Sequence, residues 1–306
     1  MTEWCLLLIC AVAHLSHGTQ MVPQVVPKSM SHFGRTQSSQ ALAVASLASL
    51  VLTAHPVPSI AATTREPKDL TSTIFDEYWM KEESPSFPPG SFSRLDSTLD
   101  TKFYETPRFV EHIDDRAVSA MANFHDAELT KQAKALGRPL DVLDLCASHV
   151  SHVSPELVSS RVIKSFYGLG LNQQELDSNP LLTRKAVHDL NKAPKYGTSE
   201  DKNGSIDVAL LQLSIDYLTS PIEVLAETAR LLRPGGYLHV SFSNRVFLTK
   251  CVGLWSGKGD DEHMETVGDY MKAARGYQMP PRVLDITGLG VGKGKDPLYV
   301  VSAQKL

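Results

Sequence analysis

The 306-residue sequence predicts an α/β fold: a doubly wound, mostly parallel sheet of seven strands behind a disordered N-terminal leader. Three observations support this prediction. Short, continuous apolar runs alternate with helical segments from residue 139 onward. A strongly punctuated helix precedes the fifth run, and the first hundred residues differ in composition from the rest.

The strands are predicted where apolar residues run continuously, because strands of a parallel sheet are buried on both faces. Five such runs are expected at residues 139–145, 162–169, 186–190, 206–213 and 237–242. Two more strands are expected at 281–288 and 297–302, around the glycine-rich loop 288–294. That loop lacks Ser or Thr after Lys293 and leads into a strand, so we interpret it as a hairpin turn and not a phosphate-binding loop.

The helix before the fifth strand has a complete set of boundary signals. Ser220 is expected as the N-cap, Pro221 as the first helical residue, and Glu223 as the acidic partner of a capping box. The stretch 234–236, Pro-Gly-Gly, is expected to end this helix. Such βαβ alternation places ligands at the carboxyl ends of the strands, near the point where the strand order reverses.

Residues 1–65 are predicted to be a targeting presequence. No Asp or Glu occurs between Glu3 and Glu66, and the stretch is rich in Ser, Thr and Ala, as in organelle transit peptides. It holds two short apolar runs, 5–13 and 41–54, neither long enough to span a bilayer. This layout favours the plastid as the destination, either its stroma or its lumen. A mitochondrial or secreted protein is the alternative, as is a membrane anchor or an ordinary helix at 41–54.

Residues 66–103 are rich in Pro and Ser and are predicted to be a disordered linker, so that the folded domain would comprise residues 104–306. The formal charge is -4 and no block of Lys or Arg occurs, so nucleic acid is not expected as a partner. The four cysteines, Cys5, Cys10, Cys146 and Cys251, have no CxxC spacing, and neither a metal site nor a disulfide framework is expected.

Several motifs occur in the order and spacing typical of one enzyme superfamily. They are 142–145 (Val-Leu-Asp-Leu), 168–170 (Gly-Leu-Gly), 189–190 (Asp-Leu) and 231–236 (Leu-Leu-Arg-Pro-Gly-Gly). With them, the chain resembles the class I S-adenosylmethionine-dependent methyltransferases, and within these the methyltransferase type 11 group. The stretch 144–152, DLCASHVSH, is similar to the loop of a plant, algal and cyanobacterial subgroup. The resemblance covers about two thirds of the chain and implies a Rossmann-like methyltransferase fold.

The resemblance also implies S-adenosyl-L-methionine as cofactor, held by residues that follow the first three strands. These residues are Asp144, Cys146, Ser148, Ser151, Gly168, Gly170, Asn172, Asp189 and Leu190. Two features depart from the superfamily. Cys146, Ser148 and Val150 replace the glycines of the first loop, and Gly170 replaces the acid that pairs with the ribose. Asn172 or Glu175 is the alternative ribose ligand. Asp189 is equally compatible with a turn cap, and Ser148 and Ser151 with a helix N-cap.

No catalytic base is fixed by the sequence. The candidates are His149 and His152 on the cofactor loop, with Asn244 and Arg245 after the fifth strand as groups that orient an acceptor. Each is equally compatible with a structural role, Arg245 as a surface ion-pair partner. Upstream, Tyr104, Arg108, His112 and Asp115 belong to a segment that often covers the cofactor in the superfamily; a plain amphipathic helix is the alternative.

Three functions remain open on the sequence. The first is a methyltransferase acting on a small molecule. The second is a methyltransferase-like domain that has lost catalysis and serves as a binding or assembly module in the plastid. The third, a dinucleotide oxidoreductase, is disfavoured because no GxGxxG follows the first strand. The acceptor and the oligomeric state are not predicted.

Overall fold

The buried apolar runs form one eight-stranded sheet in the order β1-β7-β8-β6-β5-β2-β3-β4. The computed structural model describes residues 65–82, 84–196, 203–293 and 295–306. The strands are β1 (Lys68–Asp69), β2 (Leu140–Leu145), β3 (Ile163–Gly170), β4 (Arg184–Val187), β5 (Ile206–Gln212), β6 (Leu232–Ser243), β7 (Arg282–Asp285) and β8 (Leu298–Gln304). The helices are α1 (Thr71–Ile74), α2 (Glu77–Lys81), α3 (Asp100–Phe103), α4 (Asp115–Leu136), α5 (Pro155–Ser159), α6 (Gln173–Ser178), the 3₁₀ turn η1 (Ile215–Tyr217), α7 (Pro221–Leu231) and α8 (Asp260–Ala274).

The predicted fold class is confirmed by the pairing of the strands. β4, β3, β2, β5 and β6 run parallel, whereas β8 lies antiparallel between β6 and β7. The chain order reverses beside β2, whose two neighbours are β3 and β5. A crevice at the carboxyl ends of these strands is therefore the expected ligand site.

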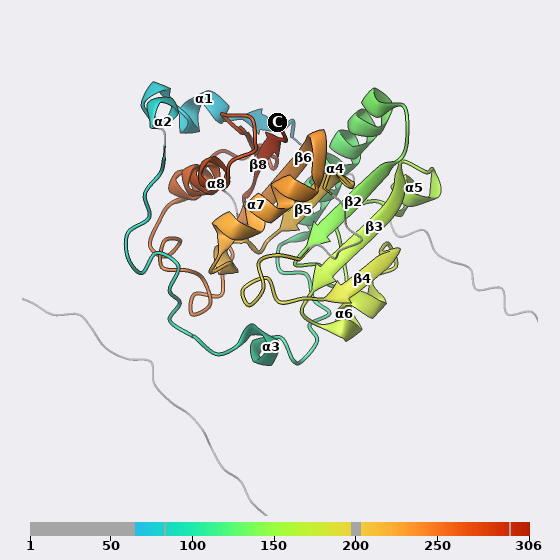
Figure 1. Ribbon diagram of the computed structural model, residues 1–306, viewed down its shortest axis with the longest axis horizontal. Coiled ribbons are helices and arrows are strands. Elements are labelled where there is room, and N and C mark those ends of the chain that lie inside the picture. Colours follow the sequence, from blue (N-terminus) through green and yellow to red (C-terminus); the bar gives the residue numbers. More distant parts are fainter. Residues whose placement is uncertain (1–64, 83, 197–202, 294) are drawn as a thin grey trace, which may run out of the picture. The chain divides into compact units, whose positions relative to one another are not determined.

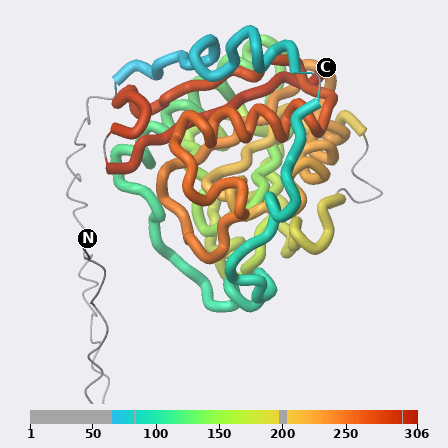
Figure 2. The backbone as a smooth tube through the Cα atoms, turned by 90° about the vertical axis from the view of Figure 1, so that its left-hand side faces the viewer, coloured from blue at the N-terminus to red at the C-terminus, as the bar shows by residue number. Residues whose placement is uncertain are grey.

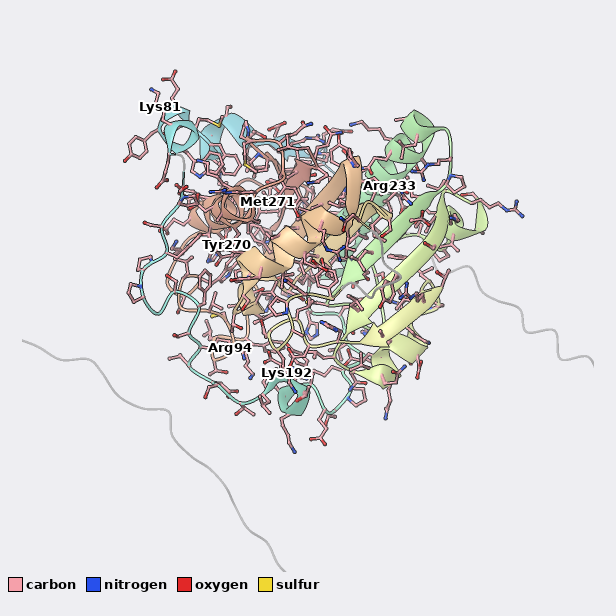
Figure 3. All side chains as sticks on the ribbon, viewed as in Figure 1. Lys81, Arg94, Lys192, Arg233, Tyr270 and Met271 are labelled. Atoms are coloured by element: carbon pink, nitrogen blue, oxygen red, sulfur yellow. The ribbon has the colours of Figure 1, made fainter. Side chains whose placement is uncertain are left out.

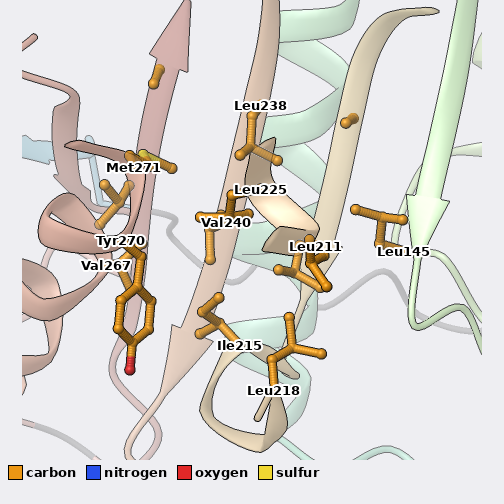
Figure 4. Close-up of a cluster of buried hydrophobic side chains, with 14 of the residues drawn as sticks. Leu145, Leu211, Ile215, Leu218, Leu225, Leu238, Val240, Val267, Tyr270 and Met271 are labelled. Carbon is orange, nitrogen blue, oxygen red and sulfur yellow. The ribbon is translucent and has the colours of Figure 1, made fainter. Parts of the chain in front are cut away.

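Helices cover both faces of the sheet (Figure 1). α4 and α5 pack on one face, where Leu129 and Leu157 join Val142 and Phe166 in a buried cluster. α7 and α8 pack on the other face. Figure 4 shows side chains of the strands facing Leu225 of α7 and the buried residues of α8. Burial on both faces is the reason that the strand sequences are continuously apolar.

α7 begins at the predicted residue, but its N-terminal capping and the position of its end differ from the prediction. The helix begins at Pro221 as expected, but the Ser220 side chain makes no capping hydrogen bond, so the predicted capping box is wrong. The helix ends at Leu231, and Pro234 and Gly235 already belong to β6. Gly236 is required because a Cβ there would lie 2.7 Å from the Asp207 carbonyl oxygen.

The third strand lies earlier than predicted, at Arg184–Val187 instead of 186–190. Its pairing with β3 begins at Tyr167 opposite Arg184 and ends at Gly170 opposite Val187. Residues 189 and 190 therefore lie beyond the strand, in the loop that follows it. This places them at the carboxyl edge of the sheet.

The glycine-rich loop between β7 and β8 is a turn, as predicted. The buried carboxylate of Asp285 accepts hydrogen bonds from the backbone N–H groups of Thr287, Gly288 and Gly290. These N–H groups, which a phosphate would need, are therefore directed at a carboxylate of the protein itself.

The prediction of a disordered linker at 66–103 is contradicted. β1 pairs with β7, and Leu70, Phe75 and Trp79 are buried in the cluster formed by α7 and α8. Figure 2 shows this N-terminal segment beside the C-terminal strands. The segment is rich in Pro and Ser, but a few large apolar side chains are sufficient to anchor it. The folded unit therefore extends upstream of the predicted start at Tyr104.

The predicted presequence, residues 1–65, lies outside the described residues except for Arg65. Within the described part of the chain, no helix is long and apolar enough to cross a membrane.

Candidate functional site

A cavity of about 380 Å³ lies at the carboxyl ends of β2, β3, β4, β5 and β6. Its size is within the range of small-molecule sites. The other wall is formed by residues 84–112, which we call the strap; Figure 1 shows its helix α3 below the arrowheads of β2 and β3. Ten of the residues named from the sequence as cofactor or catalytic candidates line it: Asp144, Cys146, Ser148, His149, His152, Gly170, Asn172, Asp189, Leu190 and Arg245.

The loop after β2 approaches the cavity closely although it lacks glycines. Cys146 has a φ of 58°, in the left-handed region that favours glycine. The loop therefore keeps the backbone shape of a glycine-containing turn, and the Cys146 side chain is accommodated at the cost of local strain.

Asp144 ends β2 with a buried carboxylate. Its Oδ1 accepts a hydrogen bond from Gln212 Nε2 at 3.0 Å, while Oδ2 has no hydrogen-bond partner among the described residues. Burial raises the pKa of Asp144 to about 6, a shift that the neighbouring Ser151 and Gln212 oppose. A buried carboxylate with one free oxygen is suited to an ammonium group of a ligand.

Glu175 connects the β2 loop with the strap. Its Oε1 accepts from the backbone N–H of Arg108, and its Oε2 accepts from the Ser148 hydroxyl, both at 2.7 Å. Asn172 caps α6 through the N–H groups of Gln174 and Glu175. Its amide Nδ2 also donates to the Tyr104 carbonyl at 2.9 Å. Both alternative ribose ligands therefore also hold the strap.

Gly170 is required by close packing and not by its backbone dihedrals. The φ of Gly170 does not lie in the left-handed region. A Cβ at this position would lie 2.1 Å from the Ala147 carbonyl oxygen. The place of the missing ribose acid is therefore filled by the backbone of the β2 loop. Gly168 does not line the cavity; a Cβ there would lie 2.5 Å from Leu182.

Asp189 lines the cavity and also caps its own loop. Its Oδ1 accepts from the N–H groups of Asn191 and Lys192 at 3.0 and 3.2 Å, which is the turn-cap alternative. Leu190 is buried, and Asn191 joins two loops and the strap by donating to the Tyr217 carbonyl and to Asp100. The sequence did not single out Asn191 as a site residue.

His152 lies in a chain of hydrogen bonds that runs along the cavity wall. Its Nε2 is 3.0 Å from Glu111 Oε2, and its Nδ1 is 3.2 Å from Gln212 Oε1. Because Gln212 donates to Asp144 through Nε2, its oxygen faces His152, and both imidazole nitrogens act as donors. The hydrogen bond between His152 and Glu111 holds the pKa of Glu111 below its usual range. Both ring nitrogens of His152 are therefore engaged by side chains of the protein.

His149 lines the cavity with one nitrogen, Nδ1, 3.1 Å from the Ser148 hydroxyl. His112 of the strap also lines it, and burial together with the nearby Arg108 lowers its pKa, which keeps the imidazole neutral at pH 7. These two imidazoles are the groups of the cavity best suited to take up a proton.

The remaining candidates lie differently from the prediction. Asn244 is exposed and does not line the cavity. Arg245 lines it but forms an ion pair with Asp296 at 2.5 Å, the alternative role left open for it. Ser151 is fully buried behind the loop, where it accepts from Asn179 Nδ2 at 2.8 Å. Asp115 begins α4 and is not part of the cavity wall.

Tyr104, Arg108 and His112, predicted to belong to a covering segment, line the cavity, whereas the sequence missed the part of the strap before residue 104 and Lys250 in the loop after β6. Arg94 and Lys250 both contact the buried Asp100, at 2.8 and 3.2 Å, at the cavity wall. Figure 3 shows Arg94 on the same side of the sheet as α3. Only Gln212 carried a local signal, a polar residue at the end of a buried strand. Within the residues that the structure describes, no group of His, Cys, Asp or Glu could hold a metal ion.

Residues 156–240, from α5 to β6, match the family model of a methyltransferase domain. The fold is similar to that of an S-adenosylmethionine-dependent methyltransferase from Aquifex aeolicus, with 18% identity, 63% of this chain and 100% of that chain covered, and a TM-score of 0.37. It is also similar to Burkholderia thailandensis 1,6-didemethyltoxoflavin-N1-methyltransferase with bound S-adenosylhomocysteine, with 14% identity, 73% and 93% covered, and a TM-score of 0.43. No curated protein matches the chain.

The structural likenesses have TM-scores below 0.5, so the fold assignment rests on the strand order. The family match and this fold agree on S-adenosyl-L-methionine as the cofactor. The cavity fits that group in one specific respect, because Asp144 lines it with a buried carboxylate whose Oδ2 has no hydrogen-bond partner among the described residues and would suit the cofactor's ammonium.

Proposed function

We propose that the protein is an S-adenosyl-L-methionine-dependent methyltransferase that acts on a small molecule. The observation that carries the proposal is the convergence of the loops after β2, β3 and β4 on one cavity at the point where the strand order reverses. The match of residues 156–240 to a methyltransferase domain supports it. We further propose that the predicted presequence directs the protein to the plastid.

Within this proposal, Asp144 binds the ammonium of the cofactor's amino-acid end. The loop after β3 borders the ribose, and the loop containing Asp189 and Leu190 borders the adenine. The bound cofactor supplies a methyl group on a sulfonium, which is transferred by in-line displacement. The protein's own contribution is then alignment and the exclusion of water.

The strap excludes water from the cavity. It is held over the cavity by Glu175 and Asn172 on one side and by Lys250 and Asn191 on the other. His149 and His112 line the cavity and could accept the acceptor's proton. A bound acceptor would therefore be separated from bulk water while the methyl group moves.

The proposal is tested by titrating the purified protein with S-adenosylhomocysteine in a calorimeter. We expect saturable one-site binding, with adenosine binding more weakly and NADH not binding. Binding of NADH in place of S-adenosylhomocysteine would indicate an oxidoreductase. No binding of either would favour the non-catalytic module, because the altered loop would then have lost the cofactor.

A further inference from the structure

Three of the four Lys and Arg side chains that line the cavity are neutralised by carboxylates. Arg94 pairs with Asp100, Lys250 contacts both Asp100 and Asp96, and Arg245 pairs with Asp296. Asp100 is buried, and only 1% of the Lys250 side chain is exposed. These pairs are part of the wall and leave no net positive charge for a ligand.

Arg108 is the fourth, and in the described part of the chain it has no ion-pair partner. Glu175 contacts its backbone N–H, not its guanidinium. The guanidinium carbon instead lies 4.4 Å from the ring centre of Phe103 and 5.2 Å from that of Phe247. Its one hydrogen bond, from Nη2 to the Phe103 carbonyl, is 3.3 Å long. Most of its donors are therefore available to a ligand in the cavity.

The guanidinium packs against Phe247 in the part of the wall that follows β6, whereas the backbone N–H of Arg108 is bonded to Glu175 beside the loop after β3. Phe247 follows β6, and it contacts Tyr217, which follows β5, and His112 of the strap. The loops expected to hold the cofactor follow β2, β3 and β4 instead. An acceptor bound opposite the cofactor would therefore meet Arg108 together with the rings of Phe247, Tyr217 and His112, which line the same cavity.

We propose that the methyl acceptor is a flat, aromatic acid whose carboxylate is bound by Arg108; this inference rests on the proposed function. A guanidinium is always charged and presents paired N–H groups that match a carboxylate. The aromatic rings restrict its motion and exclude water, which strengthens the ion pair. The same rings provide flat surfaces for the body of the acceptor.

The test uses the protein saturated with S-adenosylhomocysteine and three probe acids: benzoate, 4-hydroxybenzoate and indole-3-acetate. Each acid is compared with its neutral amide by calorimetry. We expect at least one acid to bind about tenfold or more tightly than its amide, as a charge-assisted contact allows. This preference should disappear in Arg108→Met and persist in Arg161→Met, an exposed arginine on the β2–β3 connection.

Three results would overturn the inference. The first is that no acid binds better than its amide; the second is that the preference persists in a folded Arg108→Met protein. The third is that Arg108→Met weakens S-adenosylhomocysteine binding tenfold but leaves 5′-methylthioadenosine binding unchanged. Arg108 would then bind the cofactor's own carboxylate, and the proposed function would stand without this inference. If the wild type fails to bind S-adenosylhomocysteine, both the proposed function and the inference about Arg108 are overturned. Circular dichroism melts show whether the variant is folded.

Discussion

A single interatomic distance explains why Gly170 stands where the family that the chain resembles has an acid. Its position is that of the ribose-binding acid, yet a Cβ would lie 2.1 Å from the Ala147 carbonyl oxygen. The loop after β2, with side chains where glycines are usual, lies against the end of β3; Ala147 N–H donates to the Leu169 carbonyl at 2.7 Å. The two departures therefore belong to one packing arrangement.

We predict that Gly170→Ala and Gly170→Asp both destabilise the protein, by about 1–3 kcal/mol or more, because the backbone must move to admit a side chain. Neither should increase the affinity for S-adenosylhomocysteine per folded molecule. Gly292→Ala is the control: it lies at positive φ in open space, and its cost should be about 1 kcal/mol. Urea unfolding and calorimetry measure both quantities. Tighter binding by Gly170→Asp would show that an acid can be accommodated there.

Because of Asp144, the sign of the pH dependence of S-adenosylhomocysteine binding can be predicted. Burial raises its pKa to about 6, and an ammonium ligand favours the ionised form. Binding of S-adenosylhomocysteine should therefore be strongest above pH 6 and about tenfold weaker at pH 5 than at pH 7. Asp144→Asn should bind about 1.5–3 kcal/mol more weakly at pH 7 and vary little from pH 5 to 7. An equal pH dependence in wild type and variant would assign the titration to another group, such as His112.

At the scale of elements, the segment before α4 is part of the fold although its composition resembles that of a linker. Trp79 of α2 is buried, with its indole N–H donating to Asp269 at 2.7 Å and its ring 3.7 Å from Lys272 Nζ. Phe75 stacks against it at 4.2 Å, in space that Gly268 of α8 leaves open. One end of the segment thus rests on the core, and the strap that follows it forms the cavity wall.

We predict that Trp79→Ala lowers the free energy of unfolding by about 3–5 kcal/mol, as for other large buried side chains. The adjacent Tyr78 is the matched control. Its side chain is 82% exposed against 3% for Trp79, so Tyr78→Ala should change stability by no more than about 0.5 kcal/mol. Urea unfolding measures both. Equal, small effects would mean that the segment is not anchored in solution.

At the scale of the whole molecule, the acid-free N-terminal region predicts import into an organelle. We expect residues 1–65 fused to a fluorescent reporter to accumulate in plastids, and the mature protein to begin after this region. Residues 66–306 fused to the same reporter should remain in the cytosol. A reporter found in mitochondria or in the medium, or a mature N-terminus near Thr2, would contradict the plastid proposal. Fluorescence microscopy and N-terminal sequencing provide these measurements.

The sequence by itself determined the class of fold and the edge of the sheet at which the site lies. A continuous apolar run bounded by turn residues indicates a strand that is buried on both faces. Such runs predicted the positions of β2, β3, β5, β7 and β8 closely. The motif residues Asp144, Cys146, Ser148 and Gly170 lie at the ends of strands or just after them, so their common edge could be predicted from the βαβ alternation.

The tertiary structure alone decided which of these side chains are available to a ligand. Ser151 and Arg245 are engaged by Asn179 and Asp296, which lie far along the chain. The sequence placed Tyr104, Arg108 and His112 in a covering segment, but it did not predict residues 84–103 as part of the wall, because their contacts join residues far apart in the chain, as between Asp100 and Lys250. Local composition does not record such contacts, since a few buried side chains can anchor a segment that is polar on average. Carboxylates of the fold pair with three cations of the cavity, Lys250 and Arg245 with partners far along the chain, and within the described residues Arg108 has no such partner.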